Sequence, residues 1–217
     1  EASKFNTSGI YNAAVGMQSM YSNTSGTDNA ALGYVAMYSR TSGNFNVAVG
    51  SHAMYDQISG DSNVAVGYGS LGGQTSGSNN MALGFGAVVA NTTGSNQVRI
   101  GNTAITVIAG QVAYTFTSDA RWKENIKDVK LGLDFINNLR PVEYNRKTST
   151  SSREFGFIAQ EMKSVLDRDG YADAGMITED SSPDHYLSFR SSDLLAPIVK
   201  SIQELAAAAS TTAIRGN

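Results

Sequence analysis

A repeat of 17 residues constrains the fold of the first hundred residues more than any other feature of the sequence. Recurrence at a fixed period is typical of architectures in which each unit packs mainly on its neighbours. We therefore predict a β solenoid over residues 1–101. One glycine series stands at 9, 26, 43, 60, 77 and 94 and another at 16, 33, 50, 67, 84 and 101, while asparagines stand at 12, 29, 46, 63 and 80, with Gln97 in the sixth place.

The local pattern of one repeat predicts a short strand between two turns. Val47-Ala48-Val49 is too short for a helix, and Asn46 and Gly50 bound it. Short β-branched runs between such residues are typical of strands with a turn at each end. Glycine at the same place in every coil predicts either a corner with positive φ or a close approach of neighbouring backbones.

The side chains of the repeat predict a thin core. Methionine–tyrosine pairs recur at 20/21, 37/38 and 54/55, and we interpret them as a ladder of core or subunit contacts rather than a ligand-binding aromatic strip. The strand centres are alanines, so a single chain would bury little apolar volume. We expect three-fold association to supply the missing burial. The Thr/Ser/Asn/Gly loops fit either a glycan contact or ordinary solvated turns.

Composition excludes several classes of function. The chain has 217 residues and a formal net charge of -3, and it shows no basic patch for nucleic acid. It has no cysteine, and His52 and His185 lack metal-ligand spacing, so we expect no metal and no cofactor. No apolar run approaches the roughly 18 residues of a membrane span, and no signal peptide is visible. The sequence opens within the pattern at Glu1, which favours a piece of a longer fibre.

The period breaks after residue 101. Residues 105–108 and 112–116 are apolar or β-branched runs around Ala109-Gly110, and we predict that residues 102–117 form a β connector that leads into Ser118. Residues 118–217 carry no repeat and are predicted to form a compact α+β domain. We expect helices over 130–138 and 159–166, strands over 142–145, 154–158 and 186–189, a polar loop or hairpin tip over 147–153, and a loop with one or two weak strands over 167–185.

The last predicted helix begins near residue 193, after the cap candidates at 191–193. Apolar residues then alternate by three and four, which is the pattern of a coiled-coil seam of about two heptads. Pro197 is tolerable only in the first turn of this helix. The alternative is one amphipathic helix that packs on its own domain. The seam residues are Leu195, Ile198, Ile202 and Leu205, with Ala209 after them.

Ser118 and Lys123 stand five positions apart at the junction. Lysine is a poor base while protonated, and its ordinary pKa is about 10.4. Desolvation favours the neutral amine, which can take a proton from a serine hydroxyl. The pair is therefore a candidate Ser/Lys self-cleavage dyad, and the simpler interpretation is a solvated linker between domains.

Four motifs, in this order, decide between these interpretations. The first is Ser118-Asp119-x-Arg121-x-Lys123-x-Asn125-Ile126, and the others lie at 139–144, 155–161 and 194–205. Residues 118–205 thereby resemble the C-terminal intramolecular chaperone domain of phage tailspikes and tail fibres, the self-cleaving domain of endosialidases that is shared with the myelin regulatory factors. Trp122 departs from the family, in which an aliphatic residue is frequent. The repeats are similar to the heads of trimeric autotransporter adhesins, which are trimeric β-rolls, and a triple β-helix stays open.

The resemblance implies a homotrimer that folds the upstream fibre and then cuts itself beside Ser118. It implies Ser118 as nucleophile, Lys123 as general base, and a cleavage site within Thr117, Ser118 and Asp119. Attack of Ser118 Oγ on the carbonyl of Thr117 passes through a five-membered ring and breaks Thr117–Ser118. Cutting Ser118–Asp119 instead needs another nucleophile or a neighbouring chain's serine.

The remaining candidate residues have supporting roles. Burial of Lys123 beneath Trp122 or Phe157 on trimer assembly would favour the neutral amine. The candidate orienting groups or oxyanion donors are Arg121, Glu124, Asn125, Gln160 and Glu161, each of which also fits an ordinary surface or structural role.

Three functions follow as hypotheses. The first is a segment of a virion tail fibre, assembled in the host cytoplasm, whose chaperone domain is released by cleavage and whose fibre meets a host receptor or glycan. The second is a structural or adhesive trimeric surface protein that is not cut. The third, a Ser/Lys hydrolase acting on other molecules, is disfavoured by the repeats and by the absence of a Gly-x-Ser-x-Gly elbow.

Overall fold

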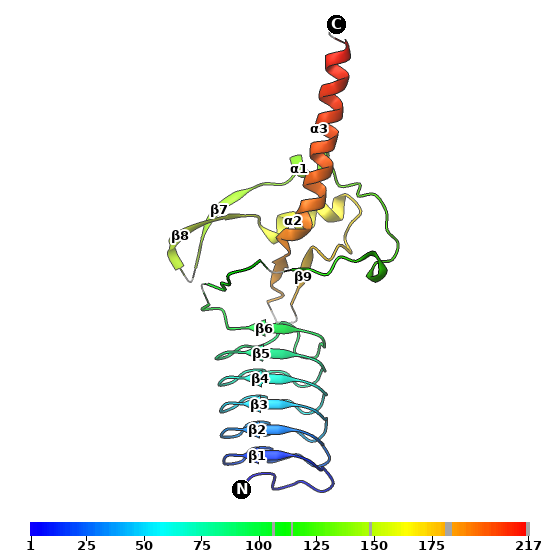
Figure 1. The fold of residues 1–217 in the computed structure, drawn as a ribbon. Helices are drawn as coiled ribbons and strands as arrows, with labels where there is room; N and C mark the ends of the chain where they lie inside the picture. The colour runs from blue at the N-terminus through cyan, green and yellow to red at the C-terminus, as the bar shows by residue number, and fades with distance from the viewer. Residues whose placement is uncertain (106, 114, 148, 181–183, 216–217) are drawn as a thin grey trace. The chain divides into compact units, whose positions relative to one another are not determined.

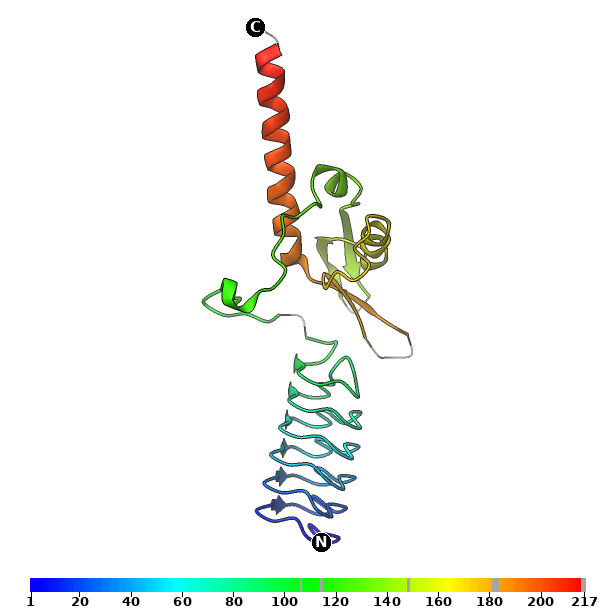
Figure 2. The ribbon, with the colours of Figure 1, turned by 90° about the vertical axis from the view of Figure 1, so that its right-hand side faces the viewer.

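The computed structural model describes residues 1–105, 107–113, 115–147, 149–180 and 184–215. The described chain divides into two compact units, residues 1–109 and residues 110–180 with 184–215. Figures 1 and 2 show the elements of each unit. No helix within the described ranges has the length and hydropathy needed to cross a membrane.

The first unit is a β solenoid, as the period predicts. Its strands pair in parallel in the order β1 to β6, and each residue pairs with the residue 17 positions on, such as Ala31 with Ala48. Each coil is thus closed and stacked within one chain (Figure 1). The strands are β1 (Ala13–Val15), β2 (Ala30–Leu32), β3 (Val47–Val49), β4 (Val64–Val66), β5 (Met81–Leu83) and β6 (Val98–Ile100).

The core of the solenoid is thin, and its residues stand in columns with the same step. The strand-centre alanines point inward, and Met20, Met37 and Met54 are fully buried beside them. The tyrosine that follows each methionine is half-buried, and the rings of 21, 38 and 55 stack with centroids 5.2 Å apart. The predicted methionine–tyrosine ladder is therefore confirmed as core and stacked contacts.

The two glycine series occupy positions where a side chain does not fit. Gly33 has φ of 144°, a conformation that side chains of L-residues rarely adopt. A Cβ atom added there would lie 2.5 Å from the carbonyl oxygen of Gly50 in the next coil. Positive φ and close approach of backbones thus act at the same corner, and the sequence alone left them as alternatives.

The asparagine column is a ladder of buried hydrogen bonds. Asn46 Nδ2 donates to Asn29 Oδ1 at 2.9 Å, and the backbone N–H of Asn46 donates to the same oxygen at 3.0 Å. Asn63 repeats both bonds onto Asn46 Oδ1, at 3.0 and 2.9 Å. One carboxamide oxygen therefore accepts two donors of the next coil, which explains why the sequence holds asparagine at this step.

We expect Asn46→Leu to destabilise the solenoid by about 3–5 kcal/mol. The substitution removes the oxygen that accepts from the backbone N–H and Nδ2 of Asn63, and the Nδ2 that donates to Asn29 Oδ1, although the backbone N–H of residue 46 still donates to that oxygen. A buried unsatisfied group costs about 1–3 kcal/mol. Chemical denaturation at a fixed protein concentration measures the loss. The matched control is Asn12→Leu in the first coil, where the side chain is half-buried and water replaces part of the lost bonding. Equal losses at the two positions would contradict the ladder's role.

Another inward column contains a fully buried charge. Arg40 donates from Nη1 to Gln57 Oε1 at 2.7 Å and from Nη2 to the carbonyl of Gly60. Burial lowers the pKa of Arg40 to about 10, while Asp61 opposes that effect. The residues at the same repeat position in the preceding and following coils, Asn23 and Gln57, carry side-chain amides instead.

Burying a charge costs more desolvation free energy than burying an amide that makes the same hydrogen bonds. We therefore expect Arg40→Gln to raise the free energy of unfolding by about 1–3 kcal/mol. Denaturant midpoints of the variant and parent measure this. A lower midpoint for Arg40→Gln would show that the buried cation is a net stabilising group.

The solenoid ends where the repeat changes its residue types. Gln97 stands where the other coils have asparagine, and its side chain binds the backbone of Asn91. Its Oε1 accepts from the N–H of Asn91 at 3.0 Å, and its Nε2 donates to the carbonyl of Asn91 at 2.8 Å. Arg99 replaces the central alanine in β6 and donates to the carbonyl of Gly101 at 3.0 Å. A bulky polar side chain at the end of the alanine column closes the stack, as terminal repeats of solenoids do.

The described residues of 102–117 form no strand, which differs from the predicted β connector. Thr106 and Tyr114, which belong to the two predicted β segments, lie outside the described residues. Their described apolar neighbours, such as Val107 and Val112, are exposed. Apolar β-branched residues favour strands only where a neighbouring strand pairs with them, and none does so here within the described chain.

The second unit is α+β. Its elements are the 3₁₀ turn η1 (Ala120–Trp122), α1 (Leu133–Asn137), β7 (Val142–Arg146), β8 (Ser149–Gly156), α2 (Ala159–Arg168), β9 (Ile177–Glu179), β10 (Leu187–Phe189), the 3₁₀ turn η2 (Ser191–Leu194) and α3 (Leu195–Arg215). β7 and β8 form one antiparallel hairpin, and β9 and β10 form another.

The predicted elements of this unit are present with shifted ends. The first helix begins at Leu133 rather than 130, and β8 begins at Ser149, so most of the predicted polar loop is strand, with Thr148 outside the described residues. Arg146 pairs with Ser149 across this tip. Pro197 lies in the first turn of α3, as the helix requires.

A small core joins the helices of the second unit. Phe135 of α1, Met162 and Leu166 of α2, and Leu194 of η2 are buried together. The carboxylate of Glu204 in α3 accepts a hydrogen bond from the backbone N–H of Leu133 at 2.7 Å. This bond spans 71 positions and satisfies one of the free donors at the start of α1. α3 is thereby fixed to the segment that follows Ser118.

Candidate functional site

The local fold of the junction brings the candidate dyad into contact. Asp119 caps η1, and the backbone N–H groups of Trp122 and Lys123 donate to the carbonyls of Asp119 and Ala120, both at 3.1 Å. This tight turn brings Lys123 back toward Ser118, and Lys123 Nζ lies 2.7 Å from Ser118 Oγ. A nucleophile and a base within hydrogen-bond reach are the first geometric requirement of a dyad. Both side chains are exposed in the single chain.

Arg121 holds the turn rather than the serine. Its guanidinium binds the carboxylate of Asp119 through two nitrogens, with Nε 3.0 Å from Oδ1 and Nη2 2.6 Å from Oδ2. The hydrogen bond from Arg121 lowers the pKa of Asp119 and raises the pKa of Arg121. The Asp119 carboxylate also accepts from the backbone N–H of Arg121 at 2.9 Å. Arg121 therefore stabilises the turn that places Lys123.

The dyad lines a groove whose other wall is the start of the last helix. Ser118, Lys123 and Val129 lie on one side of it. η2 and α3 supply the other wall, which sequence reasoning missed because no spacing rule relates residues 118–123 to residues some eighty positions later. The residues of that wall are Ser192, Asp193, Leu195, Ala196, Val199, Lys200 and Gln203.

The other predicted orienting residues lie outside this groove. Glu124 and Asn125 are exposed, and Asn125 has φ of 53° in the left-handed region. Trp122 is 81% exposed and does not line the groove with Lys123. Phe157 packs against Phe189, with ring centroids 5.9 Å apart, and does not line the groove. Residues of α3 therefore line the groove together with Lys123, whereas neither aromatic residue proposed to bury Lys123 does so.

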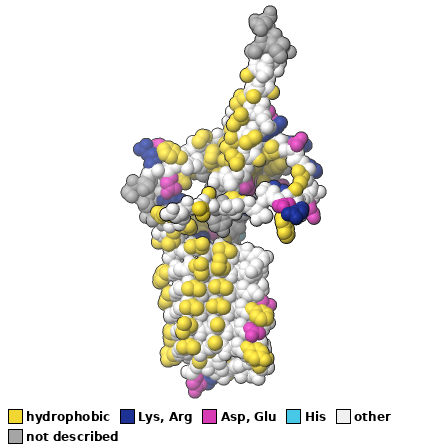
Figure 3. All heavy atoms as spheres, viewed as in Figure 1, with side chains coloured by type: hydrophobic (Ala, Val, Ile, Leu, Met, Phe, Trp, Pro, Cys, Tyr) yellow, Lys and Arg dark blue, Asp and Glu magenta, His cyan; other side chains and the backbone are white. Residues whose placement is uncertain are grey.

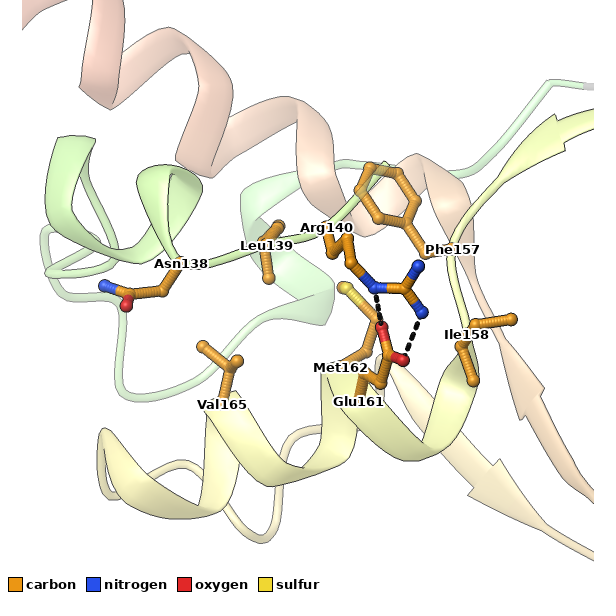
Figure 4. A pocket seen from close by; sticks show the side chains of 8 residues that line it. All are labelled: Asn138, Leu139, Arg140, Phe157, Ile158, Glu161, Met162 and Val165. Atoms are coloured by element: carbon orange, nitrogen blue, oxygen red, sulfur yellow. Dashed lines mark hydrogen bonds and ion pairs between the residues drawn. The ribbon is translucent and has the colours of Figure 1, made fainter. Parts of the chain in front are cut away.

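Glu161 belongs to a second hollow, shown in Figure 4. Its carboxylate accepts from Arg140, with Nε 3.0 Å from Oε2 and Nη2 on Oε1. The hydrogen bond from Arg140 lowers the pKa of Glu161. This pair joins the Leu139-Arg140-Pro141 motif to α2, which gives Glu161 a structural partner away from the junction. Gln160 is exposed beside it.

The seam residues of α3 are exposed in the single chain. Leu195 is 67% and Ile202 59% exposed, and Ile198 and Leu205 are exposed as well. The same helix buries Ser201, which lies beside the seam and whose hydroxyl donates to the carbonyl of Pro197 at 2.8 Å. The helix therefore packs on its own unit with one face and leaves an apolar face open.

A comparison of the sequence with known families gives a match that begins at this junction. Residues 118–171 match the family model of the chaperone of endosialidase. This family is named as a peptidase, and the match begins at Ser118, the residue that Lys123 contacts. The matched segment thus starts at the candidate dyad and runs through η1, α1, the β7–β8 hairpin and α2. No curated protein and no solved structure matches the chain.

No cluster of three or more His, Cys, Asp or Glu residues that could hold a metal ion occurs among the residues that the structure describes. The polar groups at the groove include the Ser118 hydroxyl, the Lys123 amine and the Gln203 amide on α3, with a carboxylate–guanidinium pair in the turn beside them.

Proposed function

We propose that this chain is part of a phage tail fibre or tailspike in which residues 118–217 promote trimerisation and folding of the solenoid and then separate from it by self-cleavage beside Ser118. The observation that carries the proposal is the 2.7 Å contact between Lys123 Nζ and Ser118 Oγ at the first residue of the endosialidase-chaperone match. The solenoid upstream of the dyad is the part that the cut would release as a mature fibre.

In the route through Thr117, neutral Lys123 takes the proton of Ser118 Oγ as this oxygen attacks the carbonyl carbon of Thr117. The tetrahedral intermediate collapses with loss of the Thr117–Ser118 C–N bond, and Lys123 returns the proton to the amine of Ser118. Water then hydrolyses the ester, which leaves a carboxylate on Thr117 and restores the hydroxyl of Ser118. In the other route the hydroxyl of a serine of a neighbouring chain attacks the carbonyl carbon of Ser118, and the base passes the proton of this hydroxyl to the amine of Asp119 as the Ser118–Asp119 bond breaks. Water then hydrolyses the ester, which leaves a carboxylate on Ser118 and restores the attacking hydroxyl.

Two apolar surfaces support self-association. The first is the exposed face of α3. The second lies on the solenoid, where the residues that flank each buried alanine point outward and stand in rows across the stacked strands (Figure 3). Val15, Leu32, Val49, Val66 and Ile100 belong to one such row and are exposed, and Leu83, between the last two, is half-buried. Contiguous apolar surface of this kind is typical of protein–protein contacts.

Association of the chains would also make cleavage depend on assembly. Lys123 is exposed in the single chain, and removal of water from an amine favours its neutral form. Leu195 and Val199 belong both to the exposed apolar face of α3 and to the groove wall. Packing of other chains against this face would remove water from the groove and favour the neutral amine.

The intact mass of the purified chain, with light scattering of the native sample, tests the proposal. We expect two fragments that meet beside Ser118 and a trimeric mass for the assembled protein. A single full-length mass in an assembled trimer would favour the structural or adhesive protein that is not cut. A stable folded monomer would contradict the assembly that the proposal requires.

A further inference from the structure

The groove contains one polar side chain whose hydrogen-bonding groups are free within the described chain. Ser192 Oγ lies 3.3 Å from Asp193 Oδ1, and Arg190 pairs with the same carboxylate at 3.3 Å. Lys200 Nζ pairs with Glu204 at 3.5 Å. Gln203 lines the groove beside them, and the described residues give its amide no partner. Its two N–H donors are therefore available to a group that forms in the groove.

The fold holds Gln203 in a fixed place relative to the junction. Ala196, Val199, Lys200 and Gln203 follow the three- and four-residue spacing of one helix face, and all line the groove. The next residue, Glu204, is bonded to the backbone of Leu133, which lies ten positions after Lys123. This bond fixes the backbone of α3 at the position next to Gln203, while the side chain of Gln203 is itself exposed.

Self-cleavage forms a negatively charged oxygen, which an N–H donor in the groove can stabilise. Attack on either candidate carbonyl moves an electron pair onto its oxygen, and a donor in place for this oxyanion stabilises the transition state more than the planar substrate. We infer that the side-chain amide of Gln203 donates a hydrogen bond to the oxyanion of the tetrahedral intermediate beside Ser118. This inference rests on the proposed self-cleavage and adds a catalytic residue that lies outside residues 118–171.

The inference is tested in the full-length chain by following cleavage on denaturing gels and by intact mass. Gln203→Leu removes the donors and is expected to slow cleavage by about 10²–10³-fold, the effect of losing one oxyanion donor. Gln203→Glu keeps the size but has no N–H, and is expected to be at least as slow. Gln203→Arg keeps N–H donors on a long side chain and is expected to stay within about 10-fold of the parent rate, since the donors remain.

Ser210→Leu is the matched control, because it makes a polar-to-leucine change one heptad further along α3, outside the groove. We expect the parent rate for it and a trimeric mass for all variants. Cleavage of Gln203→Leu at the parent rate overturns the inference, as does an arginine variant as slow as the leucine variant. Loss of assembly in both the leucine and glutamate variants would assign Gln203 a packing role and overturn it equally. An uncut parent chain would instead overturn the proposed function.

Discussion

Ser118→Ala is expected to give a full-length chain that still folds and assembles. The substitution removes one exposed oxygen, and with it the hydrogen bond to Lys123, so little packing is lost. Without the nucleophile, cleavage should fall by about 10³-fold or more, as it does when the attacking serine of a protease is removed. Intact mass of the purified protein after prolonged incubation measures the result. A Ser118→Ala chain that is cut at this junction would refute the dyad.

Lys123→Arg separates the role of the base from that of the hydrogen bond. Arginine keeps the positive charge and the N–H donors but is not deprotonated in proteins, so it cannot take the proton of Ser118. We expect this variant to assemble and to remain uncut. Lys127→Arg is the matched control, because Lys127 is exposed in the same segment and does not line the groove. A parent rate in Lys123→Arg would assign this lysine a positioning role only.

The double variant Ile198→Asp with Ile202→Asp is expected to abolish the trimer and to lower the yield of soluble solenoid. In the single chain both side chains are exposed, so the carboxylates cost the isolated unit little. In a trimer the same positions would meet their copies, and the carboxylates would be desolvated near one another. A cost of about 3 kcal/mol or more for association corresponds to at least about 100-fold weaker assembly. Light scattering over a concentration series measures it.

Ser210→Asp with Thr211→Asp is the control for this double variant, since it places two carboxylates on the same helix outside the seam. We expect the control to form the trimer and to be cut. The seam variant should remain uncut although Ser118 and Lys123 are intact. An unassembled seam variant that is cut at the parent rate would show that cleavage does not depend on assembly. Unchanged trimer yield would show instead that the apolar face of α3 is not the interface.

The solenoid could be predicted from the sequence because each coil contacts mainly the coil 17 residues away. A regular step in sequence is therefore a regular step in space, and Asn46 bonds to Asn29 and Asn63 for that reason. The connector could not be predicted in the same way. Its apolar residues have high strand propensity, but a strand also needs a neighbouring strand, and sequence patterns do not show whether one is there.

The contact between Ser118 and Lys123 agrees with the pair that their spacing and the order of the four motifs indicated, because the turn that brings them together is local and Asp119 and Arg121 lie within it. The catalytic role of the pair stays a prediction. The opposite wall of the groove could not be predicted. Gln203 reaches the groove through the packing of α3, which depends on the bond between Glu204 and Leu133 across 71 positions. Glu161 likewise was expected near the junction, whereas Arg140 holds it in a different hollow.

The stacked coils have a mechanical consequence for a fibre under tension. Strand hydrogen bonds join residues 17 positions apart and point along the direction in which the coils stack. A pull along that direction loads the coils in series, so the weakest coil detaches first and the others keep their shape. Each detached coil releases 17 residues, or about 6 nm of extended chain at ~3.5 Å per residue. Such a fibre yields in equal steps and limits the force that reaches its attachment point to the strength of one coil.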